Sequence, residues 1–142
     1  MNYSSVCPWD NKTTLGRILL EPTRIYIKQV LPAAKSGLIK AMSHITGGGF
    51  IENIPRMLPK NLGCYVDVAT WELPPVFRFL RSHGVEPLEM ARTFNNGLGL
   101  VIVVDPKKVQ AVLSLLDQGD PVFCIGEVTN NPGVEMRNMH LW

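Results

Sequence analysis

The run Leu100-Val101-Ile102-Val103-Val104 constrains the fold more than any other part of the sequence. Its residues are all apolar and mostly β-branched, which favours a strand covered on both faces, so we expect it in the middle of a sheet. Asp105 and Pro106 follow as an N-cap and a first-turn proline, and the apolar residues of 109–116 recur at helical spacing. A buried strand followed directly by an amphipathic helix is typical of a domain built from layers of helices and strands.

Shorter signals of the same two kinds alternate along the rest of the chain. Expected strands cover residues 39–45, 64–68, 122–128 and part of 134–142, and expected helices cover residues 25–36, 50–58, 71–82 and 87–93. Residues 1–20 contain several turn formers and predict an irregular lead-in. Without an internal repeat or a linker, residues 1–142 are expected to form a single domain. The expected class is α+β, a layered domain with a mixed sheet of about four to six strands packed by helices.

The composition argues against several classes of protein. The chain has 14 basic and 12 acidic residues, a balance that indicates neither a nucleic-acid nor a membrane partner. No apolar run approaches the roughly 20 residues of a membrane span, and the N-terminus does not resemble a signal peptide. Cys7, Cys64 and Cys124 are odd in number and far apart, which argues against a disulfide framework or a zinc site and favours a cytoplasmic protein.

The segment from Ser43 to Asn53 is the most informative about chemistry. Gly47, Gly48 and Gly49 follow an expected strand and precede an expected helix, so their amides could face an anion at a helix N-terminus. A tight turn without a ligand explains the same pattern equally well. His44 could act there as an acid, a base or a phosphate donor, or it could be a satisfied residue of an apolar strand. No Gly-Lys-Ser/Thr follows, so this is not a Walker A motif.

Two other segments could contribute to the same chemistry. Residues 92–99 place Asn95 and two glycines before the central strand, where amides could line a cleft, although Asn-Gly is also an ordinary turn signal. Residues 21–24 end in Arg24, which could pair with a phosphate or be a surface charge. No Ser/His/Asp order or metal-binding pattern stands out, and no metal ligand is predicted.

These segments, taken in order, resemble a known family. They are Leu20-Glu21-Pro22-Thr23-Arg24-Ile25-Tyr26, then His44-Ile45-Thr46-Gly47-Gly48-Gly49 with Glu52-Asn53-Ile54-Pro55-Arg56, then Arg92-Thr93-Phe94-Asn95-x-Gly97-x-Gly99. The set is similar to the C-terminal half of aminoimidazole ribonucleotide synthetases, also called phosphoribosylformylglycinamidine cyclo-ligases. The resemblance covers residues 13–128 and implies the C-terminal domain fold of that superfamily. The chain departs from the family at Asn96, where Cys or Met is usual; we expect the change to be tolerated because the Asn-x-Gly frame is kept.

The resemblance also implies an activity. Family members convert formylglycinamidine ribonucleotide and ATP into aminoimidazole ribonucleotide, ADP and phosphate in purine biosynthesis, in eukaryotes often as part of a multifunctional protein. ATP phosphorylates the formyl amide oxygen, and the amidine nitrogen then closes the ring and expels phosphate. The family's N-terminal half carries the ATP and Mg²⁺ sites and most of the dimer interface, and nothing like it is found in this sequence. We therefore expect no tightly bound cofactor and no turnover by this chain alone.

The site residues implied by the resemblance fall into two groups. His44 and Asn95 are the expected catalytic residues. The expected substrate- or phosphate-binding residues are Arg24, Thr46, Gly47, Gly48, Gly49, Asn53, Thr93, Gly97 and Gly99. Two alternatives remain open: a non-catalytic module that binds phosphate or a nucleotide and retains the fold, and another member of the same superfamily. The His-Ile-Thr-Gly-Gly-Gly and Thr-Phe-Asn strings favour the cyclo-ligase over the latter.

Overall fold

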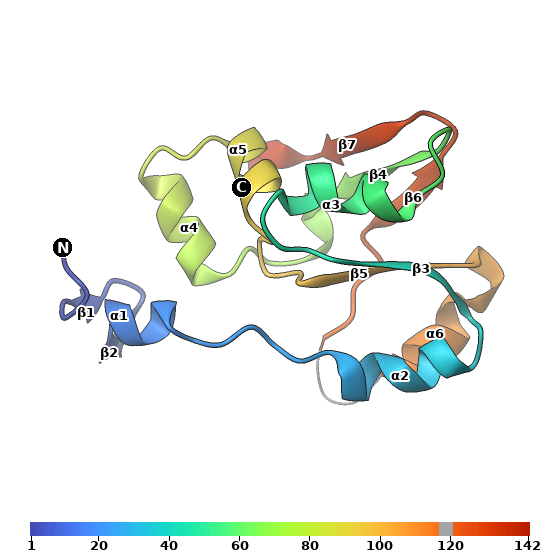
Figure 1. The fold of residues 1–142 in the computed structure, drawn as a ribbon. Coiled ribbons are helices and arrows are strands. Elements are labelled where there is room, and N and C mark those ends of the chain that lie inside the picture. The colour runs from blue at the N-terminus through green and yellow to red at the C-terminus, as the bar shows by residue number, and fades with distance from the viewer. Residues whose placement is uncertain (117–120) are drawn as a thin grey trace.

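The computed structural model describes residues 1–116 and 121–142, with the element order shown in Figure 1. The strands are β1 (Val6–Cys7), β2 (Asp10–Thr14), β3 (Ile39–His44), β4 (Gly63–Asp67), β5 (Leu100–Val104), β6 (Gly126–Thr129) and β7 (Gly133–Arg137). The α-helices are α1 (Leu15–Leu19), α2 (Ile27–Lys35), α3 (Gly49–Met57), α4 (Pro75–Ser82), α5 (Pro87–Thr93) and α6 (Val109–Leu116). Three short 3₁₀ helices are η1 (Val68–Thr70), η2 (Pro106–Lys108) and η3 (Met139–Leu141).

The α+β class is confirmed, and the strands are distributed over several small sheets. Within the described residues, β1 pairs with β2, β3 pairs antiparallel with β5, and β4 lies between antiparallel β6 and parallel β7. The β3–β5 pair lies in the middle layer, with α2 and α6 on one side and α3 with the three-stranded sheet on the other (Figure 1). The mixed strand directions expected from the sequence therefore occur in the β6-β4-β7 sheet.

The expectation that β5 is a central strand is wrong. Among the described residues its only strand neighbour is β3. Both of its faces are nevertheless covered: Val101 packs into one core, and Leu100, Ile102 and Val104 pack against the other, which contains α2 and α6. A strand can be apolar on both faces because helices and loops cover it, so the composition of a strand does not by itself reveal how many strands flank it.

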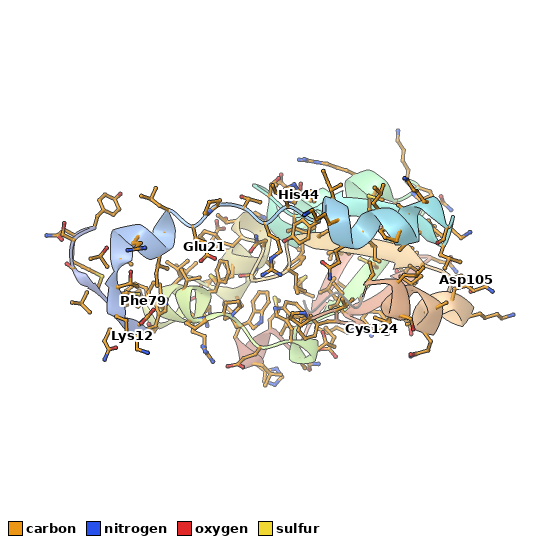
Figure 2. The ribbon with its side chains drawn as sticks, turned by 90° about the horizontal axis from the view of Figure 1, so that it is seen from below. Lys12, Glu21, His44, Phe79, Asp105 and Cys124 are labelled. Carbon is orange, nitrogen blue, oxygen red and sulfur yellow. The ribbon has the colours of Figure 1, made fainter. Side chains whose placement is uncertain are left out.

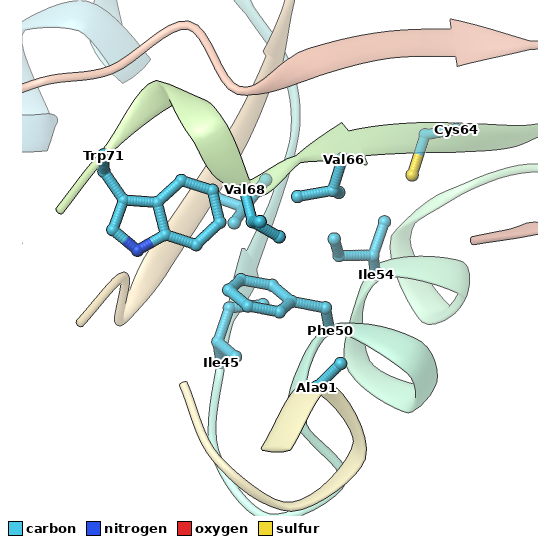
Figure 3. Close-up of a cluster of buried hydrophobic side chains, with 9 residues drawn as sticks. Ile45, Phe50, Ile54, Cys64, Val66, Val68, Trp71 and Ala91 are labelled. Atoms are coloured by element: carbon cyan, nitrogen blue, oxygen red, sulfur yellow. The ribbon is translucent and has the colours of Figure 1, made fainter. Parts of the chain in front are cut away.

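Two hydrophobic cores hold the layers together. The larger one joins α3, β4, η1 and α5, as Figure 3 shows, and consists of Ile45, Phe50, Ile54, Cys64, Val66, Val68, Trp71, Ala91 and Val101. The smaller one joins α2 to α6 through Val30, Ala33, Val112 and Leu116. Burial in the larger core raises the pKa of the Cys64 thiol to about 11, and all three cysteines are free.

Residues 1–20 are not irregular, contrary to expectation. They form the β1–β2 hairpin and α1, which together make a small lobe at one end of the molecule (Figure 1). The Thr14 hydroxyl caps α1 by accepting from the Arg17 amide, and the Gly16 amide donates to the Tyr3 carbonyl at 2.8 Å. Figure 2 shows Phe79 of α4 beside this lobe, where its ring lies 5.0 Å from the Trp9 ring. Local polar hydrogen bonds of this kind leave no hydrophobic period in the sequence, which is why the lobe was not predicted.

The segment after β7 is held to the end of β4 by the Asp67 carboxylate. Asp67, at the end of β4, accepts hydrogen bonds from the Asn138 side chain at 2.8 Å and from the Ala69 amide at 2.9 Å. These bonds, with the nearby Arg137 guanidinium, lower the pKa of Asp67 below its ordinary value of 3.8. The ionised carboxylate thus holds η1 and the segment after β7 together.

No helix in the described part of the chain is long and apolar enough to cross a membrane.

We expect this contribution to disappear in acid. Because the folded-state pKa of Asp67 is lowered, its stabilising effect is complete above the unfolded-state pKa and is lost as the pH falls through the folded-state value. Thermal unfolding of the wild type and of Asp67→Asn from pH 7 to pH 2 should show a Tm difference at neutral pH that vanishes at the acid end. Glu127→Gln, at an exposed position of β6, is the control and should show no such pH-dependent difference; a constant Asp67→Asn difference at every pH would contradict the assignment.

Candidate functional site

The three segments singled out in the sequence meet at the ends of β3 and β5. His44 and Leu100 are Cα partners in the strand pair, and the Ile45 amide donates to the Gly99 carbonyl at 2.8 Å. Tyr26, from the segment before α2, lies edge-on to His44 with the ring centroids 6.0 Å apart. A Cβ on Gly99 would clash with the Tyr26 hydroxyl, so this tyrosine also covers the second glycine segment. Residues far apart in the sequence therefore share one corner of the fold.

Two of the three consecutive glycines are required by the backbone. Gly48 and Gly49 have φ angles of +100° and +53°, in the left-handed region that side chains rarely adopt. A Cβ on Gly49 would also collide with the carbonyl of Ala91 in α5. Gly49 starts α3, and its amide donates to the Thr46 carbonyl at 3.0 Å. The interpretation of these glycines as a tight strand-to-helix turn therefore holds for Gly48 and Gly49.

Gly47 differs from its two neighbours. It is exposed, its φ lies outside the left-handed region, and a Cβ placed on it would have nothing within 4 Å. Neither the conformation nor the packing of the described residues requires glycine here. The adjacent N-terminus of α3 has no side-chain cap, although the amide of its first residue, Gly49, already donates to the Thr46 carbonyl. Close approach of an anionic ligand to the backbone would account for a glycine at position 47.

A carboxylate lies beside this loop. A Cβ on Gly48 would come within 2.8 Å of the Glu52 Oε2 atom, so the Glu52 side chain extends back over the turn. Its Oε2 atom is 3.7 Å from an Arg56 nitrogen, and both side chains are largely exposed. The sequence pattern assigns Glu52 no role of its own, although an acidic residue in the first turn of a helix is a common stabilising feature and could have indicated this position. Any anion bound at Gly47 has to share the helix N-terminus with this carboxylate.

Asn53 supports the loop from beneath. It is only 4% exposed, and its Nδ2 atom lies 3.3 Å from the Thr46 carbonyl oxygen, 3.2 Å from that of Gly47 and 2.8 Å from that of Gly49. The Ser43 hydroxyl donates to the Asn53 carbonyl at 2.9 Å. With these carbonyls turned toward Asn53, its role within the described residues is to hold the shape of the loop, and the exposed Thr46 lies on the open side.

Replacing Asn53 should destabilise the protein more than replacing Asn95, an asparagine whose side chain makes a single hydrogen bond in the described part of the chain. Asn53→Ala leaves three carbonyls without their shared donor, which we expect to cost about 2–3 kcal/mol in the free energy of unfolding. Asn95→Ala is the matched control: it removes a single bond, from the Gly97 amide at 3.0 Å, and should cost about 1 kcal/mol or less. Urea unfolding measures both values, and equal losses would refute the role given to Asn53.

The second glycine segment forms a braced turn. The Asn95 side chain accepts from the Gly97 amide, and Gly97 has a φ of +96° with Pro74 directly beside it. The Thr93 hydroxyl donates to Glu89 on its own helix, so this side chain is engaged locally. Asn95 is half-buried, whereas Thr93 and Gly97 are exposed. The Asn-Gly turn signal is thus confirmed, and the Asn95 side-chain oxygen is used within the turn.

Asn96, the residue that departs from the family pattern, is buried and hydrogen-bonded through its side chain. It is fully buried with a φ of +49°, and its Nδ2 atom donates to the carbonyls of Met90 and Phe94. Its own carbonyl accepts from the Trp71 indole at 2.9 Å. Asparagine tolerates a positive φ better than most residues, and here its side chain also fastens the end of α5. This geometry explains how asparagine is accommodated at position 96 in place of the usual Cys or Met.

His44 and Arg24 lie on the exposed side of the corner. The His44 side chain is exposed at the end of β3, in the position labelled in Figure 2, and not buried in an apolar strand. Arg24 is exposed in the same segment as Tyr26. Tyr26 itself was quoted only as part of a motif, but its contacts with His44 and Gly99 make it a wall of the site.

Metal-binding groups do not gather here. Among residues 1–116 and 121–142, no cluster of three or more His, Cys, Asp or Glu side chains could hold a metal ion. The described residues therefore offer no preformed metal cage, and we derive no step through Mg²⁺. The two described cavities are lined by other parts of the chain, one by the N-terminal lobe and one by η1, α4 and the final residues. The glycine corner is an open surface site.

Comparisons with known proteins match this chain to a family and to named relatives. The family described as "AIR synthase related protein, C-terminal domain" matches residues 2–137. The chain is 43% identical over its whole length to the bifunctional purine biosynthetic protein ADE1 of Schizosaccharomyces pombe, of which it covers 19%. It is 48% identical to the phosphoribosylformylglycinamidine cyclo-ligase of Bacillus velezensis, over 84% of this chain and 35% of that protein. A chloroplastic cyclo-ligase of Arabidopsis thaliana is 47% identical over 86% of this chain and 32% of its own length.

Proposed function

The chain belongs to the AIR synthase related C-terminal domain family, and we propose that it acts as the substrate-side domain of a phosphoribosylformylglycinamidine cyclo-ligase. Family membership confirms the resemblance drawn from the three sequence segments. The chain spans about a third or less of the length of these relatives, so the complete reaction is proposed for a protein that also contains the parts that the match leaves out. In that reaction formylglycinamidine ribonucleotide and ATP give aminoimidazole ribonucleotide, ADP and phosphate.

The observation that carries this proposal is the open glycine at position 47. An exposed glycine with no conformational or packing requirement, next to an uncapped helix N-terminus, suits a phosphate group that must approach the backbone closely. Asn53 keeps the loop in shape by holding its carbonyls on the inner side. We propose that the ribonucleotide phosphate or the transferred phosphoryl group binds against Gly47 and the first turn of α3.

The other residues of the corner would act around that anion. His44 is exposed beside the loop, where it could stabilise charge or move a proton, and the Tyr26 ring lies edge-on to it. Asn95 holds the turn before β5 through the Gly97 amide, and Gly99, at the end of that turn, bonds to Ile45 at the corner. Arg24, exposed in the neighbouring segment, would add positive charge for the phosphate. Phosphoryl transfer depends on positioning and charge neutralisation, which such an arrangement provides in part.

Other requirements of the reaction are assigned to the parts of the relatives outside the match. We propose that ATP, Mg²⁺ and most of the contacts of a dimer are bound there, since the described residues hold no fitting metal cluster. The chain alone should therefore show no cyclo-ligase turnover. A cytoplasmic location is also part of this proposal, supported by the three free cysteines.

A chimera tests the proposal. The matching C-terminal segment of the Bacillus velezensis cyclo-ligase is replaced by this chain, and ATP-dependent formation of aminoimidazole ribonucleotide is measured with the purified protein. We expect the chimera to be active and this chain alone to be inactive. A folded chimera without activity would overturn the cyclo-ligase assignment. If the isolated chain still bound inorganic phosphate in that case, the non-catalytic binding module would be the better description.

A further inference from the structure

Asn96 is the only asparagine in the sequence that a glycine follows directly. In such a pair the glycine nitrogen can attack the side-chain amide of the asparagine, because no side chain on the glycine obstructs the approach. Hydroxide takes the proton of the Gly97 amide, and the nitrogen bonds to the Asn96 Cγ atom. A succinimide ring closes, and the side-chain nitrogen takes a proton from water and leaves as ammonia. Water then opens the ring at either carbonyl, which gives aspartate or isoaspartate.

The attacking nitrogen is held in the folded chain. The Gly97 amide donates to the Asn95 side-chain oxygen at 3.0 Å. The amide has to lose its proton before it can attack, and a hydrogen bond from that proton to an acceptor opposes the loss. Gly97 itself is exposed, so burial does not keep hydroxide away from it. The bond to Asn95 is therefore the direct protection of this nitrogen.

The group under attack is held as well. The Asn96 side chain is fully buried, and its Nδ2 atom donates to the Met90 carbonyl at 2.9 Å and to the Phe94 carbonyl at 3.1 Å. Its Oδ1 atom is buried without a donor among the described residues. Attack on Cγ would place negative charge on this oxygen, and a reaction of this kind needs hydrogen-bond donors at that point. The folded chain supplies none there, so it disfavours the transition state.

The products do not fit the place that asparagine occupies. Aspartate puts a second oxygen where Nδ2 now donates to two carbonyls, and a buried carboxylate without donors is strongly unfavourable. Isoaspartate adds a methylene group to the backbone of a turn in which the Asn96 carbonyl accepts from the Trp71 indole at 2.9 Å. Either product therefore breaks the contacts that fasten the end of α5 to the larger core.

We propose that Asn96 is a deamidation site that the fold keeps closed and that unfolding opens. A chain that stays unfolded loses this side-chain amide, and the modified chain no longer refolds. The glycine corner is lost with it, because the same turn leads to Gly99 and β5. The closing and opening of the site depend only on this turn and not on the function proposed above.

Mass spectrometry of peptides from the full chain tests the site. The protein is incubated in one mildly alkaline buffer with and without guanidinium chloride, and deamidation is followed at each asparagine. We expect Asn96 to react fastest in the unfolded chain and at least about 100-fold more slowly in the folded chain, since a stable fold opens rarely. Asn61, which is exposed and precedes leucine, is the internal reference and should react slowly in both states. Similar rates for Asn96 in both states would overturn the proposal.

Refolding tests the effect of the modification. The denaturant is removed after part of Asn96 has reacted, and the folded fraction is isolated by size exclusion. We expect this fraction to contain only intact Asn96. Asn96→Asp carries one product from the start and should lack a cooperative thermal transition, whereas Asn130→Asp, the same change at an exposed position, should keep it. Deamidated chains in the folded fraction, or equal thermal midpoints of the two variants, would contradict the proposal.

A variant isolates the protection that Asn95 gives. Asn95→Ala frees the Gly97 amide and should speed the deamidation of Asn96 in the folded chain several-fold. Asp105→Ala is the matched control, because it also removes one side-chain oxygen that accepts from a backbone amide, that of Lys107 at 2.8 Å, at the other end of β5. It should speed the reaction much less. An equal acceleration in both variants would refute the role given to Asn95.

Discussion

Gly49→Ala is expected to lower the free energy of unfolding by about 3 kcal/mol or more, or to prevent folding. Two costs combine at this position. The φ of +53° is strained for alanine, and the added Cβ collides with the backbone carbonyl of Ala91, which cannot move without shifting α5. Because α3 and α5 both contribute to the larger core, relief of the clash would loosen packing around Phe50. Chemical unfolding followed by circular dichroism measures the loss.

Gly47→Ala is the control for this prediction. It changes a glycine in the same loop by the same methyl group, but at a position where the added Cβ meets nothing within 4 Å. The φ of Gly47 lies outside the left-handed region, so alanine should change stability by no more than about 1 kcal/mol in either direction. If Gly47→Ala destabilised the chain as much as Gly49→Ala, the distinction between a structural and a ligand-facing glycine would be wrong.

Gly47→Asp should abolish most of the activity of the chimera while leaving it folded. A carboxylate at this exposed position would occupy the N-terminus of α3 and repel the phosphate proposed to bind there. We expect kcat/KM to fall by about 100-fold, the order produced by removing one strong charged interaction. The thermal midpoint should change little, because a Cβ added at this position would have nothing in the described structure within 4 Å.

A neutral variant separates charge from bulk. Gly47→Asn has nearly the shape of Gly47→Asp without its charge, so we expect a milder loss of about ten-fold or less. Gly48→Asp would be a poor test, because the φ of +100° and the adjacent Glu52 would disturb the loop itself. Full activity in a Gly47→Asp chimera would show that no phosphate approaches this glycine during the reaction.

The sequence predicted the elements whose signals are local. The helix after Asp105 could be predicted because its N-cap, its proline and its apolar spacing lie within one stretch, and Asp105 does accept from the Lys107 amide. The turn before α3 and the strand before it were predicted for the same reason. The hairpin of residues 1–20 could not, because it depends on polar hydrogen bonds that have no period in the sequence.

Within the candidate site, the sequence could not distinguish the three glycines. Gly49 is fixed by a carbonyl of α5, which lies far along the chain, whereas a Cβ on Gly47 would meet nothing within 4 Å; only the tertiary structure reveals this difference. Of the two readings of His44 that the sequence left open, that of a satisfied core residue is wrong, since the side chain is exposed at the strand end. The role of Asn53 beneath the loop likewise depends on three carbonyls that the fold brings together.

The most direct test of the central claim is a calorimetric titration of this chain with formylglycinamidine ribonucleotide in the absence of ATP. We expect binding at a single site that is lost in Gly47→Asp and retained in Gly47→Ala. That result would place the substrate phosphate at the glycine corner of a domain that binds its substrate by itself. Binding that is equally strong in Gly47→Asp, or no binding at millimolar ligand, would contradict the account.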